Sequence, residues 1–261
     1  MTGWIGLSLR VTLLLALAAM PAGAQSESEE IVEVALREHG GRLIVPVRAA
    51  DGAELEFILS TGVGVTVFSE SGAARAGSPD GLTLGGLAVP SQGSQTLPDE
   101  RLETDGTVFD GMIGPNMLAD FDILIDLPRG RLLLRPAGSG GAWEGVQLSD
   151  PVRLRVLHGI VLSLDVELNG QEYPGTLEMG TPAVIVNTRA GQEAGLQSTD
   201  VATVTLGGAA HPDLPVEVRE LEIFQRWSPN GDGFVLVGAP ITYECAVSLS
   251  WVQREMRTCR R

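Results

Sequence analysis

The sequence contains no lysine. All 18 of its basic residues are arginines, and they stand against 33 acidic residues, which gives a net charge of −15. Proteins that bind nucleic acid present a continuous surface of Lys and Arg to the phosphates, and these scattered arginines predict no such surface. We therefore expect no nucleic-acid partner. The acidic excess forms no long run, so we interpret it as a solubility feature.

Cysteine and histidine are also scarce, and this limits the possible cofactors. The three histidines (His39, His158 and His211) lie far apart in the sequence, so they form no cluster with the spacing of a zinc site. We expect no metal and no cofactor. The two cysteines, Cys245 and Cys259, lie close together near the end of the chain. In an exported protein such a pair usually oxidises, so we predict a disulfide, with two buried thiols as the alternative.

Long apolar runs are missing as well. The apolar run at residues 11–20 follows Arg10 and precedes the small residues Ala22, Gly23 and Ala24. This order is typical of a secretory signal peptide, and about ten residues are few for a membrane span. We predict that residues 1–24 are a signal peptide and that the mature protein is periplasmic or secreted. We expect it to be a monomer without a transmembrane anchor; an uncleaved anchor is the alternative.

The chain contains the same order of elements twice. The hairpin dipeptides Asp51-Gly52 and Asn169-Gly170 lie 118 positions apart (169 − 51), and each follows an apolar strand pattern, at residues 43–47 and 161–168. Further on, six of nine positions are identical between residues 82–90 and 204–212. The closing hairpins, at residues 121–135 and 245–259, also match each other at a similar offset, 124 positions (245 − 121). Such regular self-similarity indicates an internal duplication.

The duplication predicts the domain organisation and the fold class. We expect a first unit at 25–136, a linker at 137–145 whose first residues, Ala-Gly-Ser-Gly-Gly, are flexible, and a second unit at 146–261. Short strands rich in Val, Ile and Leu alternate with Gly, Pro, Asn and Asp turns, which predicts an all-β protein. The best helical stretches, 69–76 and 188–195, each start with a capping residue and are closed by Gly.

This order of elements resembles the retropepsin-like and pepsin-like aspartic proteases. In the first unit, Ile58-Leu59-Ser60-Thr61-Gly62 stands where the family has its catalytic Asp-Thr-Gly turn. The family's later glycine motif is resembled by Asp110-Gly111-Met112-Ile113-Gly114. In the second unit, Gly238 is the repeat equivalent of Gly114. The resemblance implies two homologous β-barrel lobes with short helices, related by a pseudo-twofold axis. It also implies a shared site to which each lobe contributes one turn.

At that implied site the sequence departs from the family. The positions of the paired catalytic aspartates are taken by Ser60 and Glu178. Two carboxylates at hydrogen-bonding distance share one proton, which leaves one acid and one base. A serine hydroxyl titrates far above neutral pH, and a glutamate reaches about one methylene further than an aspartate. The residue types therefore predict that the catalytic pair is lost.

The residues that follow Ser60 and Glu178 match the family's Thr-Gly to different extents in the two units. Thr61 keeps the hydroxyl with which, by the resemblance, such turns are tied together across the lobe interface, whereas Met179 replaces it in the second unit. Gly62 and Gly180 are present in both, which indicates a backbone constraint of the turns. We therefore expect the two turns to be tied together from one side only.

Three functions are compatible with these residues. The first is a non-catalytic protein that holds an extended peptide or polymer in the groove between the lobes, or that has a structural role in the cell envelope. The second is an active aspartyl endopeptidase in which Glu178 pairs with another carboxylate, from Asp110 or from a second chain. The third is a protein with only an architectural likeness to the proteases, whose function lies on its loops. We expect Trp143, Trp227 and Trp251 to pack in the core and residues 230–233 to form a hairpin turn rather than a calcium loop.

Overall fold

The computed structural model describes residues 31–62, 64–198, 200–228 and 230–259. This part of the chain is mostly β-structure, as the turn-rich sequence predicts. The predicted signal peptide, residues 1–24, lies outside the described residues. Within them, no helix is both long and apolar enough to span a bilayer.

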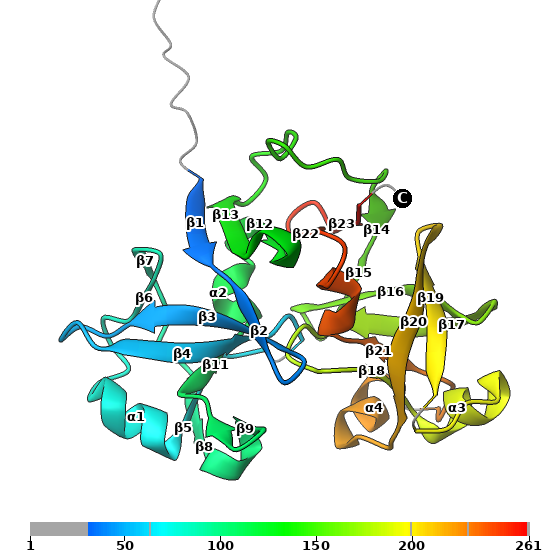
Figure 1. Ribbon diagram of the computed structural model, residues 1–261, viewed down its shortest axis with the longest axis horizontal. Coiled ribbons are helices and arrows are strands. Elements are labelled where there is room, and N and C mark those ends of the chain that lie inside the picture. Colours follow the sequence, from blue (N-terminus) through cyan, green and yellow to red (C-terminus); the bar gives the residue numbers. More distant parts are fainter. Residues whose placement is uncertain (1–30, 63, 199, 229, 260–261) are drawn as a thin grey trace, which may run out of the picture.

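The first half of the chain forms an open sheet of eight strands (Figure 1). Its central strands are β3 (Arg42–Arg48) and β4 (Glu54–Leu59), joined by the Asp51-Gly52 turn that the sequence predicts. The other strands are β2 (Arg37–His39), β5 (Val67–Ser69), β6 (Thr83–Leu84), β7 (Leu87–Ala88), β8 (Gln95–Leu97) and β11 (Gly111–Ile113). A small separate hairpin is made by β9 (Glu103–Thr104) and β10 (Thr107–Val108). The result is a half-barrel in which β7 and β8 end the main strand order and β2 is attached to β3 beside it.

The second half forms a seven-stranded sheet that closes on itself. The extra pairing of β16 with β19 joins the ends of a six-strand ring, so this half is a closed barrel with one appended strand, β15. Its strands are β15 (Arg155–Leu157), β16 (Val161–Leu168), β17 (Gln171–Leu177), β18 (Val184–Val186), β19 (Val201–Leu206), β20 (Ala209–Val218) and β21 (Val235–Val237). The duplicated sequence is thus built as a half-barrel and a full barrel.

A third sheet joins the two halves. It has six strands in the order β1-β13-β12-β22-β23-β14, and it lies between the two β-units in Figure 1. The halves meet where β12 pairs with β22, with Ile123 opposite Leu249. The bounds are β1 (Val32–Ala35), β12 (Phe121–Asp126), β13 (Arg131–Pro136), β14 (Val152–Arg153), β22 (Val247–Ser250) and β23 (Glu255–Arg257). Ile123 and Leu249 are buried in the core that also runs into both β-units.

Helices are short and lie at equivalent places in the two halves. Helix α1 (Glu70–Ala76) follows β5, and its N-cap Ser69 accepts a hydrogen bond from the Gly72 amide. Helix α3 (Thr188–Ala194) follows β18, and its N-cap Asn187 accepts one from the Ala190 amide. These capped helices are those that the sequence predicts. The remaining helical segments are α2 (Pro115–Leu118), α4 (Glu222–Trp227) and the 3-10 turns Asp99–Arg101, Leu127–Arg129 and Ala239–Thr242.

The cysteine pair is oxidised. Cys245 and Cys259 are joined by an S–S bond of 2.06 Å, with their Cα atoms 5.4 Å apart. The disulfide ties the start of β22 to the end of β23 and so closes the last hairpin of the chain. The predicted disulfide is confirmed.

The segment between the halves is held to the protein more firmly than its Gly and Ser content predicts. The amides of Gly138 and Gly140 donate to the carboxylate of Asp122 on β12. Trp143 is buried against the six-stranded sheet and packs in a cluster with Leu124 and Leu133. The composition of the first linker residues indicated no apolar group to bury, and Trp143 supplies one.

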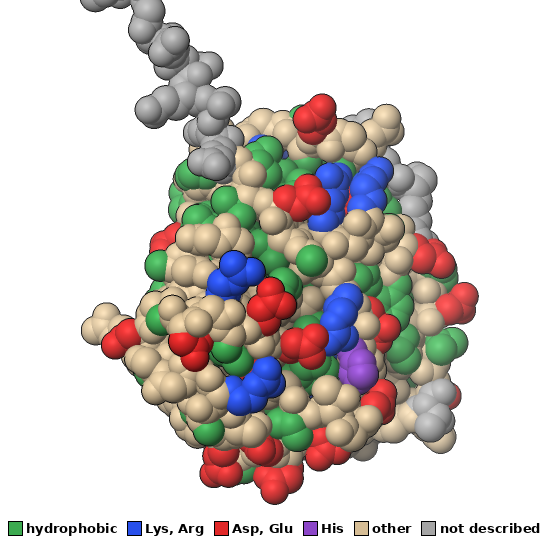
Figure 2. Space-filling model, turned by 60° about the vertical axis from the view of Figure 1, so that its left-hand side comes forward, with side chains coloured by type: hydrophobic (Ala, Val, Ile, Leu, Met, Phe, Trp, Pro, Cys, Tyr) green, Lys and Arg blue, Asp and Glu red, His purple; other side chains and the backbone are tan. Residues whose placement is uncertain are grey.

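The charged side chains are spread over the surface rather than gathered into one basic region. Figure 2 shows acidic, basic and apolar side chains interspersed on one face of the molecule. Several of the arginines form ion pairs, such as Arg37 with Glu56 and Arg48 with Glu54. This face therefore offers no continuous positive surface of the kind that nucleic acids need.

Candidate functional site

Two turns from opposite halves of the chain meet in the interior, and we call them the turn pair. The first is Ser60-Thr61-Gly62, directly after β4, and the second is Glu178-Met179-Gly180, directly after β17. Their strands are anchored alike. The Ser60 amide donates to the Ile113 carbonyl at 2.9 Å, and the Glu178 amide donates to the Val237 carbonyl at 2.9 Å.

Parallel strand pairing explains why the turns occupy equivalent places. β4 pairs in parallel with β11, and β17 pairs in parallel with β21. Each partner strand ends at a glycine, Gly114 or Gly238, that caps a short helical segment. A Cβ atom on Gly238 would lie 2.3 Å from the Ala183 carbonyl oxygen, so this position requires glycine because the backbone approaches too closely.

The carboxylate of Glu178 joins the two turns. Its Oε2 accepts hydrogen bonds from the Ser60 hydroxyl at 2.9 Å and from the Gly62 amide at 2.9 Å, both in the opposite turn. Its Oε1 accepts from the Gly180 amide of its own turn at 2.7 Å. The side chain is almost fully enclosed, since Glu178 is only 6% exposed and Ser60 is 0% exposed. One carboxylate therefore occupies the centre of the turn pair and bonds to both sides.

The Glu178 carboxylate explains why both turns have glycine at their third position. A Cβ atom on Gly62 would lie 2.6 Å from Glu178 Oε2, and a Cβ atom on Gly180 would lie 2.8 Å from Oε1. Neither distance is possible for a real side chain without displacement of Glu178. The glycines therefore allow the two amides to approach the carboxylate.

Thr61 ties the turns together from the first half only. Its hydroxyl donates to the Leu177 carbonyl at 2.8 Å and accepts from the Met179 amide at 3.2 Å. Met179 is completely buried and carries a thioether, which is at most a weak acceptor. The threonine hydroxyl bonds are thus one-sided, but the Glu178 carboxylate of the second half also bonds across the interface, so the turns are tied from both sides rather than from the one side that the sequence predicts.

One hairpin of each half contacts the segment that follows the turn of the other half. Gly41, between β2 and β3, lies so close to Pro182 that a Cβ atom there would be 2.3 Å from the proline Cβ. Gly64 lies near Ile160, which precedes β16, at a Cβ distance of 3.6 Å. Gly64 and Pro182 hold the same place in the repeat, 118 positions apart (182 − 64). Each hairpin therefore packs against the segment that follows the turn of the other half.

Burial determines the acidity of the central carboxyl. The enclosure of Glu178 raises its pKa above the ordinary value, although the hydrogen bonds from Gly180, Ser60 and Gly62 act in the opposite direction. The protonated form of Glu178 is therefore favoured more than in a solvated glutamate. Protonated or ionised, this carboxyl has amides and a hydroxyl as its neighbours.

Sequence reasoning did not find Arg42, whose charge interacts with Glu178, or Arg219, whose charge acts on Arg42. Burial lowers the pKa of Arg42, the negative charge of Glu178 raises it, and the nearby Arg219 lowers it again. The Nε atom of Arg42 is buried and has no hydrogen-bond partner among the described residues. Neither arginine belongs to a repeated motif, so the duplication gave no signal for them.

Asp110 lies away from the turn pair. Its carboxylate accepts hydrogen bonds from Arg75 at 2.8 Å and from the Glu56 amide at 2.8 Å, and burial raises its pKa. The Asp110 amide donates to the Glu56 carbonyl, which places it beside a residue four positions before Ser60. Four residues of extended strand span roughly 13 Å. Asp110 is therefore not the second carboxylate that the hypothesis of an active peptidase required.

No model of a known protein family matches this chain, and no curated protein is significantly similar to it. Within the part of the chain that the structure describes, no cluster of three His, Cys, Asp or Glu side chains could hold a metal ion. The chemistry open to the turn pair is therefore judged from its own groups. These are one buried carboxyl, one serine hydroxyl, one threonine hydroxyl and backbone amides.

Proposed function

We propose that this chain is a non-catalytic relative of the aspartic proteases that binds extended peptide or polymer chains. The equivalent anchoring of the two turns, to Ile113 in one half and to Val237 in the other, supports the family relation and the pseudo-twofold arrangement. The disulfide between Cys245 and Cys259 supports export to the periplasm or beyond, where such bonds persist.

The hydrogen bonding of Glu178 carries the proposal. Activation of a water molecule by the aspartic-protease route requires two carboxyl groups that share a proton. The groups that bond to the Glu178 carboxylate are the Gly62, Gly180 and Thr61 amides and the Ser60 hydroxyl, and none of its partners among the described residues is a carboxyl. A backbone amide and an ordinary serine hydroxyl do not ionise near neutral pH, so neither can act as the second acid or base. The carboxylate therefore acts as an interlobe clasp.

Binding of an extended chain is supported by two edge strands that flank the turn pair. β2 pairs only with β3, and β15 pairs only with β16, within the described residues. Their outer edges carry backbone groups to which an extended peptide can add as a further strand. Arg37 and Arg155 start these strands at equivalent positions of the repeat, so the two edges form a matched pair.

A cleavage assay separates this function from the endopeptidase alternative. The mature protein is incubated with denatured casein from about pH 3 to 7, the range in which a carboxyl pair shares one proton. We expect no cleavage by the wild type or by Glu178→Gln. Cleavage by the wild type that disappears in Glu178→Gln would establish an active peptidase and overturn the proposal.

A binding assay then tests the positive half of the proposal. Fluorescently labelled, denatured casein fragments are titrated with the protein, and anisotropy is measured. We expect saturable binding that persists in Glu178→Gln, because the edge strands do not depend on the central acid. Absence of binding to any fragment would contradict a peptide-binding function and favour a purely structural role.

A further inference from the structure

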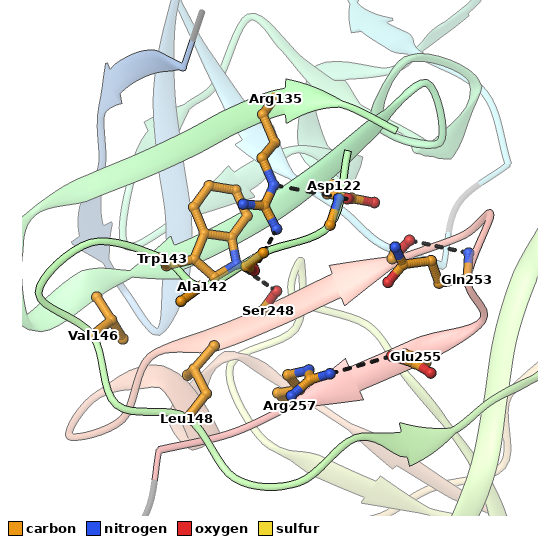
Figure 3. A pocket seen from close by; sticks show the side chains of 13 residues that line it. Asp122, Arg135, Ala142, Trp143, Val146, Leu148, Ser248, Gln253, Glu255 and Arg257 are labelled. Atoms are coloured by element: carbon orange, nitrogen blue, oxygen red, sulfur yellow. Dashed lines mark hydrogen bonds and ion pairs between the residues drawn. The ribbon is translucent and has the colours of Figure 1, made fainter. Parts of the chain in front are cut away.

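A polar pocket of about 300 Å³ lies on the six-stranded sheet, at a place that the turn pair does not reach (Figure 3). Alternate residues of β12 and β22 face opposite sides of this sheet. Ile123 and Leu249 face the main core, whereas Asp122 and Ser248 face the pocket. The linker passes over the sheet and supplies the opposite wall. The pocket therefore contains residues from both halves of the chain and from the segment between them.

The wall of the pocket is fixed by contacts to the sheet. Trp143 of the linker donates from its indole Nε1 to the Ser248 hydroxyl at 2.9 Å. The guanidinium of Arg135 lies over the Trp143 ring, 4.1 Å from its centre, and Figure 3 shows the two side chains stacked at one end of the pocket. Arg135 also donates to the Gly141 carbonyl at 3.0 Å. These contacts fix the linker against the sheet and define the shape of the pocket.

The side chains that line this pocket have hydrogen-bond donors without an acceptor in the part of the protein that the structure describes. The Arg135 side chain is only 9% exposed, and its Nε has no hydrogen-bond partner among the described residues; the nearest acid, Asp122, is 3.7 Å away. The hydroxyls of Ser248 and Ser250 each accept a hydrogen bond, from Trp143 and from the Gln253 amide. Because a hydroxyl carries one hydrogen, each of them still has that hydrogen to donate.

Arg257 adds a further donor at the other end of the pocket. Its only ion pair among the described residues is with Glu255, at 3.5 Å, which leaves most of its guanidinium hydrogens uncommitted. The two acids do not cancel this surplus. Asp122 accepts from two linker amides, and Glu255 is also paired with Arg153 at 3.4 Å. Among the described lining residues, the buried side-chain atom without a hydrogen-bond partner is therefore a donor, Arg135 Nε.

We propose that this pocket binds a small molecule with one carboxylate and a short apolar body. A carboxylate matches two guanidinium groups and two hydroxyls, since it has about four lone-pair positions and accepts from arginine in a bidentate manner. Two arginines and two acids line the pocket, so a monoanion is favoured over a dianion such as phosphate. Val146, Leu148 and the edge of Trp143 provide the apolar surface for the body. The volume is at the small end of ligand pockets.

N-acetyl-L-leucine is a suitable probe, and N-acetyl-L-leucinamide is its matched control without the negative charge. Titration calorimetry on the full-length mature protein should show saturable binding of the acid and at least about tenfold weaker binding of the amide, as expected when a charged hydrogen-bond partner is removed. No binding of the acid at about 10 mM, a concentration at which even a millimolar ligand saturates, would overturn the proposal. Equal binding of the two compounds would do the same.

Two variants locate the binding in this pocket. Arg257→Gln removes a lining guanidinium that is 42% exposed, and it should weaken binding of N-acetyl-L-leucine at least about tenfold. Arg153→Gln is the control, because Arg153 contacts the same Glu255 but does not line the pocket. Arg153→Gln should change the affinity less than about twofold, as expected for an exposed charge. Equal effects of the two substitutions, or none from Arg257→Gln, would contradict the proposal.

Two further titrations test whether the bound carboxylate can be a peptide C-terminus and whether the pocket binds independently of the turn pair. A hexapeptide ending in leucine, with a free or amidated C-terminus, shows whether a peptide end enters the pocket or only a free small acid does; either result supports carboxylate recognition. Glu178→Gln should bind the probe as the wild type does, because no residue of the turn pair lines the pocket. Binding of the probe to this pocket is therefore tested independently of peptide binding at the edge strands.

Discussion

The hydroxyl of Ser60 donates a 2.9 Å hydrogen bond to the carboxylate of Glu178, a residue 118 positions further along the chain. This bond crosses between the two duplicated halves at a buried point. Only one partner of this bond titrates near neutral pH. The first predictions concern the contribution of this bond to stability.

Substitution of Glu178 by Gln should change the pH dependence of stability. The folded-state pKa of Glu178 is raised above its ordinary value of 4.5, with burial as the main cause. The stability that Glu178 contributes is then fully present below about pH 4.5 and is lost as the pH rises through the raised pKa. The neutral glutamine has no such loss.

Urea unfolding of the wild type and Glu178→Gln at pH 4 to 8 tests this sign. The amide nitrogen of Gln faces a backbone N–H, which costs about 1–3 kcal/mol at every pH. We therefore expect the wild-type advantage to shrink as the pH rises. An advantage that grows with pH would show that Glu178 is stabilised as the anion, contrary to the direction stated here.

Thr61→Val should destabilise the protein by about 1–3 kcal/mol, because it leaves the buried Leu177 carbonyl and Met179 amide without their partner. Thr205→Val on β19 is the control, since Thr205 is partly exposed and its side chain makes no hydrogen bond among the described residues. Its effect should stay within about 0.5 kcal/mol. Chemical denaturation of both variants measures the difference, and equal midpoints would refute the role of Thr61 in the clasp.

Gly62→Ala should cost about 1–3 kcal/mol, because its methyl group would lie 2.6 Å from Glu178 Oε2 and must push the carboxylate aside. Gly64→Ala is a matched control two residues away, where the methyl group would meet Ile160 at an ordinary 3.6 Å. Thermal unfolding should separate the two variants clearly. If Gly64→Ala were the more damaging change, the carboxylate would not be the constraint on this turn.

Loss of the disulfide should destabilise the protein by about 3 kcal/mol, as expected for a loop of this size. The bond closes a segment with a sequence separation of 14 between Cys245 and Cys259. The double variant Cys245→Ser, Cys259→Ser should therefore unfold at lower urea concentration than the wild type. Reductant should shift the wild type to the midpoint of the double variant and leave that variant unchanged. A reductant effect on both proteins would point to a cause other than this bond.

Much of the fold could be predicted from the sequence because the duplication repeats its local signals. The predicted strand at residues 161–168 coincides with β16, and the helical stretches predicted at 69–76 and 188–195 correspond to α1 and α3, which are capped by the side chains of Ser69 and Asn187. These features depend on neighbours in the sequence. The same is true of the disulfide, which needs only two cysteines in one hairpin and an oxidising compartment.

Other features depend on which segments meet in space, and the sequence offered little to predict them. The halves share their repeat, but only the second closes into a barrel, through the contact of β16 with β19. Arg42 lies close enough to both Glu178 and Arg219 for their charges to act on it, and neither arginine belongs to a repeated motif. The hydroxyl bond from Ser60 to Glu178 requires the lobe arrangement itself, since the two residues are in different halves.

The six-stranded sheet has a consequence for the history of the duplicated halves. Three of its strands come from each half, and they meet along the pairing of β12 with β22. Either half alone would leave β12 or β22 with an open edge and would expose apolar residues such as Ile123 or Leu249 to water. Two originally similar segments have thereby become obligate partners. A substitution in β12 must therefore remain compatible with β22, and a substitution in β22 with β12.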